Sequence, residues 1–307
     1  MTFAASLGWS LLRALIVTLL AWPCCHWIMA WIDRDESPRR AWRITAIVVP
    51  FLYPELLIGY AYGWLVAGFP ARAECACSLL MWLRIIPVGV VALWLTPASS
   101  VTASAFHCRK LSLRTWSDRR DWLRLWLLGP VARVLPSGIL MLLVTFQQFE
   151  LAALLKAVSW TDWLFVQQVG GLTLEESLKV MWVPVAGQVG LLLIALACAR
   201  TCRRDIGDSK LERQIPSRDF VAVGLVVLSW FVFVIVPTFG LCAGLPAGIA
   251  QLLTQQLRLA GLARELIGGL SISTIAALIA YTACGVAIRA RAFRETPVGV
   301  VLTGLLI

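Results

Sequence analysis

Few residues of this sequence could do chemistry, and the first of them is a carboxylate inside an apolar run. Glu55 follows Pro50 and Pro54 in the stretch ITAIVVPFLYPELLIGYAYGWL. An ionised carboxylate in a bilayer interior costs about 2.5 to 3.5 kcal/mol on insertion scales, so we expect Glu55 to face a water-filled cavity or to pair with a cation such as Arg84. The two prolines leave backbone carbonyls free to line a path. Glu55 is therefore a candidate for a solute pathway or for a buried structural pair.

A second polar group ends the apolar run GILMLLVTFQQFELAALL. Gln147, Gln148 and Glu150 follow nine apolar or small residues there, with Phe149 between the last two. Polar side chains at the end of a membrane helix are found where a translocation path opens, although ordinary interfacial residues have the same composition. Gln148, Phe149 and Glu150 are therefore pathway candidates.

Catalytic and metal-binding patterns are missing from the sequence. With two histidines and no HExxH, GxSxG or Asp-rich motif, an enzyme acting on lipid is a weaker alternative. No GxxxxGK[ST] motif occurs, so we do not expect the chain to hydrolyse ATP by that route. The nine cysteines lack CxxC spacing, which favours neither a metal nor a cofactor. Cys75 and Cys77, in a predicted outer loop, are the only pair that we consider for oxidation or metal binding. His26 is expected to be a hydrogen-bonded packing residue or an interface anchor and not a proton relay.

The elements that must position these residues are membrane helices. Hydrophobic residues make up 60% of the chain and charged residues 14%, and the mean hydropathy is +0.82. Backbone groups in lipid must be satisfied within their own segment, which favours helices of about 20 residues. The fold class is therefore all-α, a polytopic membrane helix bundle. We predict seven full spans at 7–31, 44–68, 78–97, 131–150, 180–199, 219–243 and 267–288, and a partial eighth from Pro297.

The positive charges predict the orientation of these spans. Most of the 27 Lys and Arg residues lie in alternate loops, which we assign to the inner face, and this places the N-terminus outside an inner membrane. The net charge of +10 then requires no nucleic-acid partner. Arg13 lies inside the first span, and we expect it to snorkel to the surface.

The most basic of the inner loops, residues 107–133 (the basic segment), is too charged to cross a bilayer. Its apolar residues recur at spacings of three, four or six, which predicts an amphipathic helix lying on the inner face. Such a helix could dock another protein or simply anchor the fold. The residues that we expect to bind a partner are Arg114, Trp116, Arg119, Arg120, Trp122, Leu125 and Trp126.

Three motifs resemble the permease subunits of binding-protein-dependent ABC importers, and most closely the iron(III)-type branch. The pattern P-x-x-x-P-x-x-x-x-x-Y-A-Y is matched by Pro50, Pro54, Tyr60, Ala61 and Tyr62, a turn after the basic segment by Leu135 and Pro136 (or Gly129 and Pro130), and an acidic-Phe pair by Phe149 and Glu150. The family's Glu-Ala-Ala triplet has no counterpart here.

The resemblance implies a role and a set of partners. It identifies the basic segment with the cytoplasmic coupling loop that docks into an ABC ATPase subunit. It also implies a periplasmic substrate-binding protein, a second permease chain as a further partner, and iron(III) as the small solute carried along a path that includes Pro50, Pro54, Glu55, Tyr60 and Tyr62. No cofactor and no enzymatic activity are expected. A non-transporting membrane scaffold, or the remnant of a permease, is the alternative.

Two units are expected along the chain. Residues 1–205 would form a first five-helix permease unit, and residues 206–307 the start of a second, incomplete one, after a polar linker with Gly207 and Pro216. A shift of 260 residues pairs Gly8 with Gly268 and Cys24 with Cys284, which is a weak repeat signal. In the outer loop before the fifth span, Thr173 and Glu176 have the spacing of a capping box.

Overall fold

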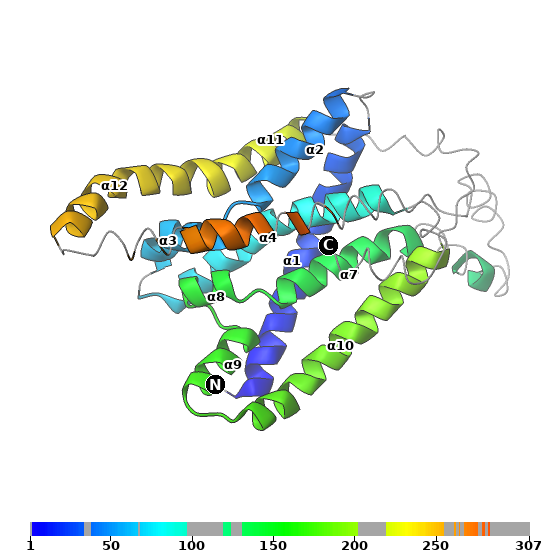
Figure 1. Cartoon of the computed structure of the whole chain (residues 1–307). Helices are drawn as coiled ribbons and strands as arrows, with labels where there is room; N and C mark the ends of the chain where they lie inside the picture. The colour runs from blue at the N-terminus through cyan, green and yellow to red at the C-terminus, as the bar shows by residue number, and fades with distance from the viewer. Residues whose placement is uncertain are drawn as a thin grey trace. The chain divides into compact units, whose positions relative to one another are not determined.

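A computed structural model describes residues 2–33, 38–66, 68–96, 119–123, 131–201 and 219–254, together with 261, 264, 267–275, 278–279 and 282. These residues are helical apart from short turns and connections, and no strand occurs among them, as the sequence predicts (Figure 1). The helices are α1 (Phe3–Ile32), α2 (Pro38–Phe51), α3 (Glu55–Val66), α4 (Pro70–Leu95), α7 (Ala132–Phe146), α8 (Glu150–Leu155), α9 (Trp160–Val169), α10 (Leu174–Thr201), α11 (Asp219–Trp230), the π-helix η2 (Phe231–Ile235) and α12 (Val236–Thr254).

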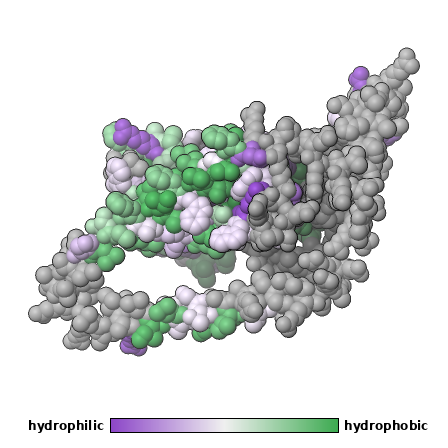
Figure 2. Space-filling view, turned by 90° about the horizontal axis from the view of Figure 1, so that it is seen from above, coloured by the Kyte–Doolittle hydropathy of each residue, from purple (hydrophilic) through white to green (hydrophobic). Residues whose placement is uncertain are grey.

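Several of these helices are long and apolar enough to cross a membrane. In the described part of the chain there are four, Phe3–Ile32, Pro70–Leu95, Leu174–Cys198 and Asp219–Pro246, and the bent pair α2 and α3 brings the number to five if it is one span. Large apolar side chains are exposed on them, for example Trp182 and Phe220, and Figure 2 shows that apolar residues cover much of the described part of one face. These features support a membrane protein, whereas seven full spans and a partial eighth stay a prediction.

Helix α1 lies at the core of the compact unit Met1–Gly240, which we call the first unit. Its buried residues recur every three or four positions along one side, from Ser10 to Ile32, and this side contacts α4, α7, α9 and α11. Where α1, α4 and α7 meet, a side chain at Gly89 would place its Cβ only 2.4 Å from the sulfur of Met141 and 2.5 Å from that of Cys25. The three helices can approach this closely only because residue 89 is glycine.

Two of the predicted spans are broken. The expected helix 44–68 is two helices, α2 and α3, which are bent by 62° at the break after Phe51. Pro54 explains the break, because a proline has no N–H to donate and disfavours helical backbone in the residue before it. The expected helix 131–150 ends as α7 at Phe146, and α8 begins only at Glu150. Prolines lie at the first break, whereas the second contains none, and its residues Gln147 and Gln148 donate hydrogen bonds to Gln188 and Glu55.

The predicted boundaries need a further correction at α4. This helix begins at Pro70, eight residues before the expected start at 78, with proline in its first turn, where no N–H is required. Cys75 and Cys77 therefore lie on a helix and not in an outer loop. Cys77 is buried and Cys75 is exposed, and neither is part of a disulfide.

The chain divides into two compact units, Met1–Gly240 and Leu241–Ile307. Within the first unit, α11 contacts α1, α2 and α4. The boundary after residue 205 stays a prediction. Of the basic segment, residues 119–123 and 131–133 are described and helical, the latter at the start of α7, and Arg119 and Arg120 are exposed. Arg114, Trp116, Leu125 and Trp126 lie outside the described residues, as does the run that begins at Pro297.

Candidate functional site

A group of polar side chains lies at the break between α2 and α3. Glu55 stands in the first turn of α3, and its Oε1 lies 3.0 Å from Nη2 of Arg84 on α4. The two side chains are only 19% and 12% exposed. The prediction that Glu55 pairs with Arg84 is confirmed. Two charges that are this little exposed need additional hydrogen bonds for their remaining polar atoms.

The break itself supplies these bonds for the guanidinium. Nη1 of Arg84 donates to the backbone carbonyl of Tyr53 at 3.2 Å, and the guanidinium carbon lies 5.2 Å from the centre of the Phe51 ring. The Tyr53 carbonyl is available because Pro54 interrupts the helix. The sequence argument that the prolines free backbone carbonyls therefore applies at this position.

A residue in the second break, between α7 and α8, also binds the Glu55 carboxylate. Nε2 of Gln148, in the connection between α7 and α8, donates to Oε2 of Glu55. Glu150, the first residue of α8, interacts electrostatically with both Glu55 and Arg84. Helices α3 and α8 lie against each other, and Leu154 of α8 contacts Gly59 so closely that a Cβ there would lie 2.3 Å from the leucine side chain. Glu55, Arg84 and Gln148 form what we call the Glu55 site.

The other pathway candidates are more scattered. Phe149 packs against Phe165 of α9, with ring centres 5.5 Å apart. The Tyr62 hydroxyl donates to the carbonyl of Val232 in η2 at 2.8 Å, so this tyrosine joins α3 to the π-helix. Tyr60 is 71% exposed. Pro50 is buried and Pro54 is exposed. Among the eight predicted pathway residues, all of which the structure describes, Gln148 and Glu55 are joined by a side-chain hydrogen bond.

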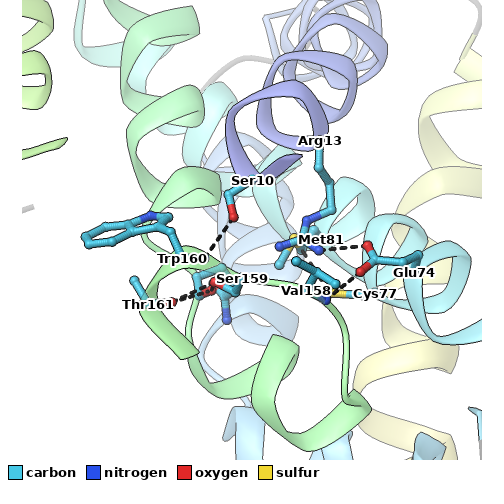
Figure 3. A network of polar contacts seen from close by, with 10 residues as sticks. Ser10, Arg13, Glu74, Cys77, Met81, Val158, Ser159, Trp160 and Thr161 are labelled. Atoms are coloured by element: carbon cyan, nitrogen blue, oxygen red, sulfur yellow. Dashed lines mark hydrogen bonds and ion pairs between the residues drawn. The ribbon is translucent and has the colours of Figure 1, made fainter. Parts of the chain in front are cut away.

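A second ion pair was not predicted. Arg13 does not snorkel to the surface, because it is 6% exposed and its Nη1 lies 2.9 Å from Oε2 of Glu74 (Figure 3). The other oxygen of Glu74 accepts the backbone N–H of Val158. Sequence reasoning missed this pair because it placed Glu74 in a loop, before the expected start of the third span. The correct start of α4 at Pro70 would have put both charges on membrane helices.

The remaining polar candidates are accounted for by local bonds. The indole Nε1 of Trp22 donates to Nε2 of His26 at 3.0 Å, which agrees with the first of the two expectations for this histidine, a hydrogen-bonded packing residue. Within the described ranges, no three His, Cys, Asp or Glu side chains come together as a group that could hold a metal ion. No family model, no curated protein and no solved structure matches the chain.

Proposed function

We propose that this chain is the transmembrane permease component of an ABC importer, and that the Glu55 site lies on its translocation path. The observation that carries the proposal is that two broken helices meet at their breaks, since Gln148 in one break donates to Glu55 at the other. Interrupted helices near the middle of a bilayer form the solute sites of many transporters, because irregular backbone is tolerated there only where it is buried in protein or lines a cavity.

The depth of the two breaks supports the proposal. Helices α2 and α7 have 14 and 15 residues before their breaks, which corresponds to about 21 to 23 Å at 1.5 Å per residue. Counted from the predicted span starts at 44 and 131, the breaks after Phe51 and Phe146 would lie about 12 and 24 Å from the inner face, so both would lie within a hydrocarbon core of about 30 Å. A charged pair at that depth costs more than an apolar pair of the same size, and function is the usual reason for such residues.

The partners follow from the same proposal. A separate ABC ATPase subunit would dock on the basic segment at the cytoplasmic face, and a periplasmic substrate-binding protein would deliver the solute to the outer face. The protein would lie in an inner membrane with its N-terminus outside. Iron(III) is the solute that the resemblance implies, and a second permease chain would complete the path.

Association with an ATPase tests the proposal. A tagged chain purified in detergent from its native membranes is expected to bring an ABC ATPase subunit with it. Trp122→Asp combined with Leu125→Asp should abolish this association while the chain still inserts, because charge is placed on the expected docking face. Val169→Asp is the matched control, since Val169 is 75% exposed at the end of α9, on the opposite predicted side. Unchanged co-purification with the double variant would refute the proposed docking, and absence of any ATPase would favour a scaffold.

A further inference from the structure

The connection between α8 and α9 is held by side chains from two other helices. The backbone N–H of Val158 donates to Oε1 of Glu74 on α4, and the N–H of Trp160 donates to Oγ of Ser10 on α1 at 3.0 Å. Figure 3 shows Ser10 beside Trp160 and Glu74 beside Val158. Trp160 begins α9, and the first N–H groups of a helix have no partner within the helix. The two side chains therefore satisfy backbone donors that would otherwise be left unpaired in a buried place.

An ion pair with Arg13 holds the Glu74 carboxylate in place. The guanidinium of Arg13 binds Oε2 at 2.9 Å, while Oε1 remains for the Val158 N–H, so each carboxylate oxygen has one partner. The side chain of Arg13 is 5% exposed and that of Glu74 is 19% exposed. The carboxylate consequently has little freedom to rotate, and the connection takes its position from α1 and α4.

The same connection holds the backbone of Gln148. The hydroxyls of Ser159 and Thr161 lie 3.3 and 3.4 Å from the carbonyl oxygen of Gln148, which accepts from them. The indole Nε1 of Trp160 donates to the carbonyl of Phe146 at 2.9 Å, and their rings stack with centres 5.5 Å apart. Residues on either side of the second break are thus tied to the start of α9. A shift of this connection would move Gln148 relative to Glu55.

We propose that Glu74 and Ser10 are positioning residues, which hold the connection between α8 and α9 so that the Gln148 amide stays on the Glu55 carboxylate. Neither residue touches Glu55, and each acts through the backbone of 158–160. For this role, residue 74 needs an oxygen atom that accepts the Val158 N–H. The negative charge of Glu74 is needed only to neutralise Arg13. The importance of the arrangement for transport rests on the proposed function, whereas the positioning itself does not.

The experiment compares two backgrounds that both lack the ion pair. Arg13→Met with Glu74→Gln keeps an acceptor for the Val158 N–H, and Arg13→Met with Glu74→Met removes it. In each background, and in the unaltered full chain, the fall in apparent Tm caused by Gln148→Met is measured after purification in detergent. Coupled sites give non-additive losses, and independent sites give additive ones.

We expect the fall in apparent Tm caused by Gln148→Met to be nearly the same in the Glu74→Gln background as in the unaltered chain. In the Glu74→Met background we expect this fall to be about half as large or less. Equal losses in the two backgrounds would overturn the proposal. If the Glu74→Met chain does not fold, Ser10→Ala takes its place, and an undiminished loss there has the same meaning. Ser137→Ala is the control, because the Ser137 hydroxyl bonds Gly89 at 3.1 Å away from this connection. If Ser137→Ala reduced the fall in apparent Tm caused by Gln148→Met as much as Glu74→Met or Ser10→Ala does, the proposal would also be overturned.

The two proposals fail separately in these tests. The thermal comparison contains no transport or ATPase measurement, so its failure leaves the permease proposal intact. Loss of the ATPase association with preserved coupling between residues 74 and 148 would remove the transport interpretation and retain the positioning role.

Discussion

Removing one partner of the Glu55–Arg84 pair should destabilise the protein far more than removing both. In Arg84→Met, the Gln148 amide is the one member of the Glu55 site that still bonds the Glu55 carboxylate. In Glu55→Met, the Arg84 guanidinium keeps the Tyr53 carbonyl and the Phe51 ring. Breaking a buried pair costs about 3 to 5 kcal/mol. Because the two side chains are 12% and 19% exposed, we expect a value near the lower limit, about 3 kcal/mol, for each single variant.

The double variant separates a structural role from a functional one. Replacing a buried pair by apolar side chains of similar volume is often neutral or stabilising, so the free energy of unfolding of Glu55→Met with Arg84→Met should stay within about 1 kcal/mol of the original. The measurement is reversible unfolding in mixed detergent, followed by circular dichroism. If the site lies on the solute path, the double variant should nevertheless lose uptake in reconstituted vesicles. A double variant as unstable as the single ones would refute the reasoning, since the pair would then be essential to the fold itself.

Two further predictions concern packing and capping. Gly89→Ala should lower the free energy of unfolding by about 1 to 3 kcal/mol, because the new Cβ would lie 2.4 Å from the Met141 sulfur, and thermal unfolding in detergent measures this loss. Thr173→Ala should cost about 1 kcal/mol and speed amide hydrogen exchange in the first turn of α10, because the Thr173 hydroxyl accepts the Glu176 N–H and the Glu176 carboxylate accepts the Thr173 N–H at 3.0 Å. Glu175→Ala is its control, since this exposed carboxylate forms a surface ion pair with Lys179, and an equal effect there would contradict the capping explanation.

Features that depend on local sequence were predictable. The apolar composition determines the helical class, because backbone groups in lipid must bond within their own segment. The capping box of Thr173 and Glu176 is confirmed, since it joins residues only three apart. Pro50 and Pro54 indicated free backbone carbonyls, although the span 44–68 was predicted as one helix, and the pairing of Glu55 with Arg84 followed from the cost of an isolated charge in an apolar run.

Tertiary structure decided which polar groups meet. Arg13 and Glu74 are 61 residues apart, and Gln148 and Glu55 are 93 apart, so no local pattern brings either pair together. Their meeting depends on the order in which α1, α3, α4 and α8 lie beside one another. Hydropathy is alike along all these helices and does not distinguish neighbours. The sequence alone therefore determined that the buried charges needed partners, because an unpaired charge is costly in an apolar environment. Which residues pair was determined by the arrangement of the helices, because the cost of burial does not depend on which partner is nearby.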